Sequence, residues 1–140
     1  MFELIYKSTA KPDISSTDIL KILNLSKHFN SFHDITGCLL YFNHEFIQVL
    51  EGEEIEVKKL YSRIEKDKRH SNVVLIKQGN KSLRTFKNWS MAYHELKKSE
   101  INDLHQKHFI DSFLTISKLS EKPTDVVKLF WQLSQQMLKS

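Results

Sequence analysis

The stretch Glu45-Phe46-Ile47-Gln48-Val49-Leu50-Glu51-Gly52 decides the fold, because it sets a polar amide in the middle of an apolar run. Alternation in a strand puts Phe46, Gln48 and Leu50 on one face. Ile47 and Val49 then lie on the opposite face, so we expect a strand that is covered on both sides. A buried amide without partners costs about 1–3 kcal/mol. Gln48 therefore lies on a less buried edge, or it has specific polar partners; taken alone, the run favours an ordinary core or edge glutamine.

Strand and helix patterns surround this stretch in a regular order. Alternating apolar residues mark the strands, whereas capping residues and i, i+3, i+4 spacing mark the helices. In chain order we expect a strand over Phe2–Ser8, a helix from the Ser15–Asp18 cluster to about Asn30, a strand over Thr36–Phe42, a turn at Asn43-His44 into the Gln48 strand, a helix over Val57–Ile64, a strand over Val73–Ile76, a loop over Gly79–Ser82 and a strand over Trp89–Tyr93.

The remainder of the chain has a helical pattern. One helix is expected around Ile101–Leu114, and a second begins at Lys122-Pro123-Thr124-Asp125, where Pro123 suits the first turn. We therefore predict an α+β fold: a ferredoxin-like, five-stranded mixed sheet with two helices on one face and two additional C-terminal helices on the other. Residues 1–96 form the core of this prediction, and residues 97–140 form a helical extension packed on the sheet within the same structural domain.

Composition narrows the class of protein. The 140 residues suit one domain, and 40% hydrophobic with 27% charged residues is an ordinary globular balance. The net charge of +4 comes from scattered residues rather than a basic stripe, so nucleic acid is not an expected partner. The single cysteine, Cys38, excludes an internal disulfide and a cysteine-based metal site, and its apolar neighbours suggest a buried residue. With no signal peptide and no membrane-spanning run, we expect a cytoplasmic protein that does not bind a membrane.

Several polar side chains are predicted to meet at one place. If the first strand and the Gln48 strand are neighbours, Tyr6 and Gln48 project from the same face, where a phenol and an amide form a natural hydrogen-bond pair. Asn30 lies near the end of the first helix. Arg63 and Asp67, four residues apart, are expected on one face of the second helix.

These groups would surround a groove between the two helices, with apolar walls from Ile22 and Ile64. Such a groove suits a flat heteroaromatic ligand with donors and acceptors along its edge. Taken singly, each residue also has an ordinary structural interpretation. Tyr6 would be a core tyrosine, Asn30 a helix end, and Arg63 with Asp67 a solvent-facing ion pair.

The ordered set of motifs resembles the BLUF domains, which are blue-light sensors that use flavin. The resemblance covers about the first 95 residues. It consists of Leu4-Ile5-Tyr6-Lys7-Ser8, Asn30, Ile35-Thr36-Gly37-Cys38-Leu39-Leu40-Tyr41, Phe46-Ile47-Gln48-Val49-Leu50-Glu51-Gly52, Asp67-Lys68-Arg69-His70, Arg84-Thr85-Phe86 and Trp89-Ser90-Met91.

This resemblance implies roles for particular residues. Tyr6 and Gln48 match the photoactive tyrosine and glutamine beside the flavin ring, and Asn30 matches the asparagine at the polar edge of that ring. Trp89 and Met91 match strand residues tied to signalling, whose arrangement differs between family structures. The flavin contacts that the resemblance implies are Tyr6, Ser8, Ile22, Asn30, Gln48, Arg63, Ile64, Asp67 and His70. Phe29 replaces a polar residue found in many relatives, which leaves the flavin form open among FAD, FMN and riboflavin.

The leading hypothesis is a blue-light receptor that binds FAD or FMN non-covalently and is not an enzyme. The resemblance implies that light moves an electron and a proton away from Tyr6, and that the hydrogen bonds of Gln48 then rearrange and shift the flavin absorption to the red. We expect no effector domain in this chain, so the signal goes to a downstream protein in trans or to an assembly of copies.

The rival hypothesis is a ferredoxin-like fold used as a small-molecule-binding or hydrolytic enzyme without photochemistry. That would need a nucleophile–base pair or an anion-binding glycine loop, and none of the three glycines lies in a phosphate-loop pattern. His105 and His108 have no evident third ligand, so no metal site is expected. The colour of the purified protein separates the hypotheses, because a flavoprotein is yellow.

Overall fold

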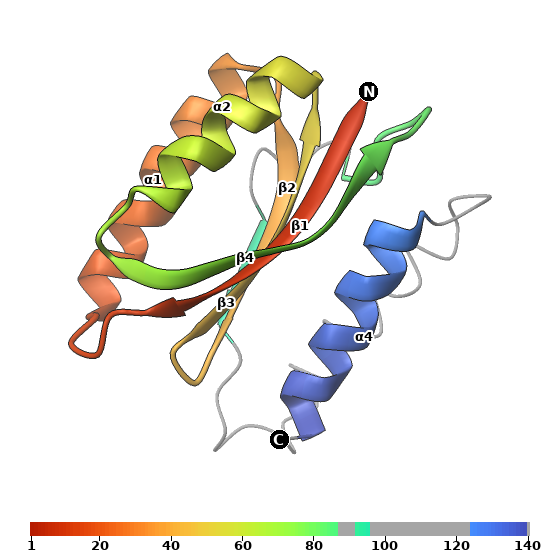
Figure 1. The fold of residues 1–140 in the computed structure, drawn as a ribbon. Helices are drawn as coiled ribbons and strands as arrows, with labels where there is room; N and C mark the ends of the chain where they lie inside the picture. The colour runs from red at the N-terminus through yellow and green to blue at the C-terminus, as the bar shows by residue number, and fades with distance from the viewer. Residues whose placement is uncertain (87–91, 96–123, 140) are drawn as a thin grey trace.

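One sheet lies between helices on both of its faces (Figure 1). The structure, a computed structural model, describes residues 1–86, 92–95 and 124–139. Two helices, α1 (Ser16–Phe32) and α2 (Glu54–Glu65), lie side by side on one face, and α4 (Asp125–Lys139) crosses the other. Within the part of the chain that is described, no helix is long and apolar enough to cross a membrane.

The strands follow the order β4-β1-β3-β2-β5. Their bounds are β1 (Phe2–Ala10), β2 (Thr36–Phe42), β3 (Glu45–Gly52), β4 (His70–Asn80) and β5 (Ala92–Glu95). The first four strands of this order pair antiparallel, whereas β5 pairs parallel to β2. The predicted α+β class is thus confirmed, with a four-stranded antiparallel sheet in the ferredoxin-like order at its centre.

Local sequence signals explain where the helices begin. Ser15 caps α1: its hydroxyl accepts from the Asp18 N–H, and the Asp18 carboxylate accepts from the Ser15 N–H, each at 3.1 Å. Thr124 caps α4, because its hydroxyl accepts from the Val127 N–H at 3.3 Å. The predicted place of Pro123 and the predicted helix over 101–114 lie outside the described residues. The boundary between residues 96 and 97 likewise remains a prediction.

The turn between β2 and β3 is the predicted one. Asn43 and His44 both have positive φ, 48° and 65°, and Phe42 pairs directly with Glu45. Two consecutive residues with positive φ match the right-handed twist of the strands that they join. Strand β3, which follows this turn, pairs with both β1 and β2, so Gln48 lies on a central strand rather than at an edge.

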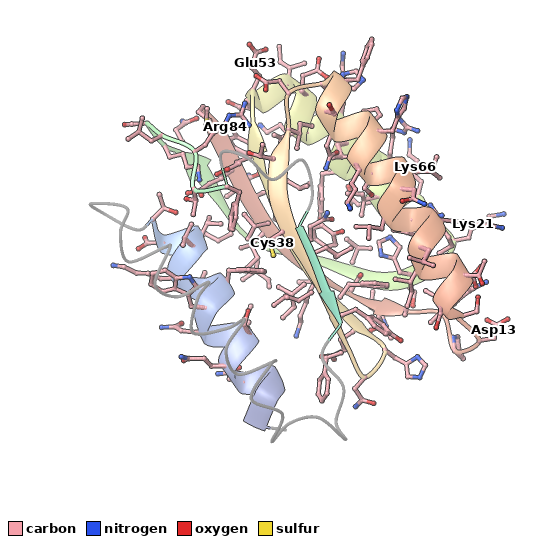
Figure 2. All side chains as sticks on the ribbon, turned by 180° about the vertical axis from the view of Figure 1, so that it is seen from behind. Asp13, Lys21, Cys38, Glu53, Lys66 and Arg84 are labelled. Atoms are coloured by element: carbon pink, nitrogen blue, oxygen red, sulfur yellow. The ribbon has the colours of Figure 1, made fainter. Side chains whose placement is uncertain are left out.

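Strands β1, β2 and β3 are buried on both faces, as the alternation around Gln48 predicts. Beneath α1 and α2, the core includes Leu4, Tyr6, Leu39, Phe46, Leu50, Val57 and Leu60. Beneath α4, it includes Ile5, Cys38, Leu40, Ile47, Val49, Phe86, Val126 and Phe130. Cys38 lies on this second face (Figure 2), and burial raises the pKa of its thiol well above the ordinary value, as suits a packing residue.

Two details differ from the sequence prediction, and a third is untested. Gly79 and Asn80 belong to β4 rather than to a loop, because β4 pairs with β1 as far as Phe2↔Asn80. Lys81, expected on an exposed loop, has a side chain only 2% exposed. The last described strand covers Ala92–Glu95, so the predicted start of that strand at Trp89–Met91 lies outside the described residues.

Candidate functional site

A cavity of about 600 Å³ lies between the sheet, α1 and α2. It is the groove that the sequence predicts, since both expected apolar walls, Ile22 and Ile64, line it. The predicted site residues that line the cavity are Tyr6, Ile22, Gln48, Arg63, Ile64, Asp67 and His70. Residues that sequence reasoning missed include Leu25, Phe29, His33, Phe46, Lys66 and Arg69.

Tyr6 and Gln48 form a buried pair at the base of this cavity. They are direct partners across β1 and β3, and the Tyr6 hydroxyl donates a hydrogen bond to Gln48 Oε1. Only 3% of Tyr6 and 4% of Gln48 are exposed. Of the two alternatives for Gln48, the structure therefore excludes a less buried edge and gives the amide a specific partner.

Burial keeps the Tyr6 hydroxyl protonated. Desolvation is the main cause that raises the pKa of Tyr6 far above its ordinary value, and negative charge on Tyr61 and Asp67 raises it further. The Tyr61 ring lies 5.6 Å from the Tyr6 ring, centroid to centroid. Tyr6 therefore enters any chemistry in the cavity as a neutral phenol whose hydroxyl donates a hydrogen bond to Gln48.

His70 is fixed by two hydrogen bonds. Its Nε2 lies 2.5 Å from the Ile64 carbonyl oxygen, and its Nδ1 lies 2.8 Å from Ser8 Oγ. A carbonyl can only accept, so Nε2 carries a proton, and in the neutral ring Nδ1 accepts from the Ser8 hydroxyl. Ser8 itself is not among the residues that line the cavity; it is placed to orient His70 instead.

The prediction that Arg63 and Asp67 share one face of the second helix is wrong, and the alternative of an ion pair between these two described residues is not found either. The helix ends at Glu65, so Asp67 lies beyond it, and its carboxylate accepts from Arg69 Nε at 3.0 and 3.1 Å and from Arg69 Nη2. These bonds lower the pKa of Asp67 below its ordinary value. Arg69 precedes His70 in the motif quoted above, and that position could have pointed to it.

Arg63 instead helps to join the two helices across the cavity. Its guanidinium carbon lies 4.7 Å from the centroid of the Phe29 ring, a cation–π contact. Phe29 stacks on His33 at 4.1 Å, and His33 Nδ1 lies 2.7 Å from Glu56 Oε2 on α2. An apolar residue at position 29 thus has a structural use here that sequence reasoning did not foresee.

The structure does not bring every predicted residue to the cavity. Asn30 is fully buried on α1, and its backbone carbonyl accepts from the Ile35 N–H at 2.8 Å. Asn30 is not among the residues that line the cavity. Its contact with a ligand remains a prediction. Trp89 and Met91 lie outside the described residues, so their roles also remain predictions.

Comparison with known proteins decides the family. The BLUF model, described as sensors of blue-light using FAD, matches residues 1–92. The chain belongs to the BLUF family. The blue light- and temperature-regulated antirepressor BluF of Escherichia coli (strain K12) is 33% identical over 106 residues, which are 76% of this chain and 26% of that relative. The chain thus spans about a quarter of this curated relative.

Solved structures of BLUF proteins share the fold. The dark-state structure of BlrB, a BLUF protein, has a TM-score of 0.69 and 27% identity, over 96% of this chain and 96% of that one. Klebsiella pneumoniae BlrP1 with FMN and cyclic diGMP has a TM-score of 0.78 and 25% identity, over 96% of this chain and 34% of the other. A flavin is therefore the class of ligand to compare with the size and chemistry of the cavity.

Proposed function

We propose that the cavity between α1 and α2 holds the flavin of this BLUF sensor, and that the Tyr6–Gln48 pair is its photoactive element. The observation that carries the proposal is the buried hydrogen bond between these two side chains at the base of the cavity. A phenol without an acceptor and an amide without a donor would each be costly in that position.

The cavity fits a flavin in size and chemistry. Its volume of about 600 Å³ lies within the range of small-molecule sites. Ile22, Phe46 and Ile64 offer apolar surface to a flat ring, and the Gln48 amide offers a donor and an acceptor to its polar edge. Asn30 and Ser8 are proposed to support this edge, the first by contact and the second through His70.

The rim of the cavity favours a phosphorylated flavin. Lys66 and Arg69 both line it and carry positive charge, which suits the phosphate of FMN or FAD better than uncharged riboflavin. Asp67 holds the Arg69 guanidinium in place through its two oxygens. We therefore propose FAD or FMN as the cofactor.

The chain's own contribution is a hydrogen-bond switch. A bound flavin supplies the absorption of blue light and an excited state that takes an electron and a proton. The Tyr6 hydroxyl donates directly to Gln48, and burial keeps the proton on that hydroxyl until light is absorbed. Once both the electron and the proton have returned to Tyr6, the Gln48 amide can settle with a different set of partners. Few such sets exist in a dry site, because each must satisfy every buried polar group.

The output is proposed to go to a separate signalling protein. The relative in Escherichia coli is described as an antirepressor, which favours a protein partner for this sensor too. An assembly of copies is the alternative route, and no direct contact with nucleic acid or a membrane is proposed. Cytoplasmic location remains a prediction that cell fractionation tests.

Purification with excess flavin tests the proposal. We expect a yellow protein that releases FAD or FMN on denaturation, identified by chromatography and mass, and that shifts reversibly to the red under blue light. A protein that stays colourless with riboflavin, FMN and FAD would contradict it and favour the non-photochemical, enzyme-type alternative.

A further inference from the structure

A buried cluster of charges lies on the face of the sheet opposite the cavity. Glu51 on β3 is fully buried, and Glu3, its direct partner on β1, is 2% exposed. The Lys81 ammonium contacts both carboxylates, at 2.9 Å for Glu3 Oε1 and closely for Glu51 Oε2. The sequence analysis gave these residues no role of their own, and none of them lines the cavity.

Glu51 differs from Glu3 in what else it binds. Its Oε1 accepts from the Phe86 N–H at 2.6 Å, and its Oε2 accepts from the Thr85 N–H at 2.9 Å. Both amides belong to the segment after β4 (residues 81–86), which lies outside the described strands. Buried amides need acceptors, and a carboxylate supplies the strongest kind.

At the edge of the charged cluster, the hydrogen bonds of Arg84 also hold residues 81–86 in place. Arg84, at the end of the sheet where β1 begins (Figure 2), donates to the Asp34 carbonyl at 2.7 Å and to Thr36 Oγ1 at 2.9 Å. Thr36 in turn donates to Glu51 Oε1 at 2.8 Å. Residues 81–86 are therefore attached to β3 through the buried Glu51 carboxylate. They are attached to the start of β2 through the Arg84 guanidinium.

This attachment places Phe86 beneath α4. Phe86 is buried in the core with Val126 and Phe130, and its ring lies 6.3 Å from that of Phe130. The chain continues from Phe86 toward Ala92, which pairs with Cys38 on β2. Phe86 thus packs against α4. In the sequence it comes shortly before Trp89 and Met91.

Strand β3 links this cluster to the cavity. Gln48 and Glu51 are three residues apart, so they face opposite sides of the sheet. Their strand lies at the centre of the sheet, between β1 and β2. A light-driven change can move α4 only through contacts that differ between the dark and lit states. Ile47 and Val49 of this strand already pack in the core beneath α4, and Glu51 adds hydrogen bonds from the strand to Thr85 and Phe86.

We propose that Glu51 is a positioning residue of the output: it holds Thr85 and Phe86 on β3, so that a shift of this strand at Gln48 reaches α4. The inference rests on the proposed function. It adds a route through the α4 face of the sheet, separate from the predicted roles of Trp89 and Met91.

The test compares E51Q with E3Q. The amide nitrogen in E51Q cannot accept, so Thr85 or Phe86 loses its partner, whereas E3Q removes a buried carboxylate that binds neither. In the dark, hydrogen exchange at whichever of the Thr85 and Phe86 amides loses its acceptor should rise about tenfold or more in E51Q, and exchange at both should stay near wild type in E3Q. Under blue light, both variants should keep the red shift, but E51Q should largely lose the light-minus-dark exchange difference over Asp125–Lys139.

A wild-type exchange difference over α4 in E51Q, or an equal loss in E3Q, would overturn the proposal. If E51Q does not fold, R84Q loosens the same segment from the partly exposed rim, and a wild-type difference over α4 in R84Q overturns the proposal as well. A wild-type chain without any red shift would overturn the proposed photochemistry instead. Dark exchange at Thr85 and Phe86 would then still decide whether Glu51 holds the segment.

Discussion

Tyr6 illustrates how a single residue acquires its chemistry from its surroundings. Its ring is an ordinary core element, packed near Tyr61, and its hydroxyl has one acceptor, Gln48 Oε1. Burial disfavours the phenolate, so the pKa rises far above its ordinary value of about 10. The Tyr6–Gln48 hydrogen bond should consequently persist over the whole range of pH in which the protein is folded.

This shift predicts how stability depends on pH. The folded state holds the Tyr6 proton more tightly than the unfolded state, so the stabilisation is fully present below about pH 10 and declines as the pH rises further. Tyr6→Phe cannot titrate at this position. Denaturant unfolding of both proteins from pH 7 to about 11 should show that only the wild type loses this extra stability above about pH 10. Parallel curves would contradict the buried, protonated phenol.

Asn30, like Ser8, is a predicted ligand contact that is not among the residues lining the cavity. Loss of one partner from a buried hydrogen bond costs about 1–3 kcal/mol, or about 5- to 150-fold in affinity. If Asn30 binds the flavin edge, Asn30→Ala should lower flavin occupancy by such a factor. Lys21→Ala, at an exposed position of α1, is the control. Equal occupancy in the two purified variants would remove Asn30 from the site.

Among the elements, β2 and β3 depend on a close approach at Gly37. A Cβ added there would lie 2.0 Å from the Val49 carbonyl oxygen, and backbone cannot yield as a flexible side chain does. Gly37→Ala should therefore destabilise the fold by about 1–3 kcal/mol or more. At Gly79, an added Cβ meets nothing within 4 Å, so Gly79→Ala is a matched control. Denaturant unfolding should separate the two variants, and equal stabilities would contradict the close strand pairing.

Sequence patterns predicted the elements best where burial is two-sided, or where turn and capping residues mark the end of an element. The apolar run around Gln48 predicted a covered strand, and the Asn43-His44 turn and the Ser15 cap were found where expected. Strand β4 is longer than predicted. It lies at an edge of the sheet and none of its residues is buried, so its full length leaves no burial pattern in the sequence. Its length comes from pairing with β1, which no local pattern in β4 reveals.

Charged residues account for most of what the sequence did not reveal in the site. Asp67 was assigned to α2 because nothing in the sequence marks a stop at Lys66, and Arg69 belongs to a basic cluster that ordinarily lies on the surface. Buried Glu51 and Lys81 are exceptions to the rule that such residues are exposed. Their burial depends on partners distant in the sequence, so only the folded structure reveals it.

For the molecule as a whole, the cavity and α4 lie on opposite faces of one sheet, so a signal must cross that sheet. The predicted role of Met91 and the proposed role of Glu51 are two routes across it. Met91→Ala should keep the red shift and weaken the light-dependent exchange difference between Tyr93 and Ser140. If Met91→Ala keeps the full wild-type difference there, the signal leaves the flavin site by another path.

The central claim is that Tyr6 and Gln48 together form the photoactive element of a flavin sensor. The light-minus-dark absorption spectrum of Tyr6→Phe and Gln48→Leu, each purified with flavin beside the wild type, tests this most directly. We expect all three proteins to be yellow and only the wild type to shift reversibly to the red under blue light. The first variant lacks the hydroxyl that donates, and the second lacks the amide that exchanges partners. A wild-type light-minus-dark spectrum from either variant would contradict the account.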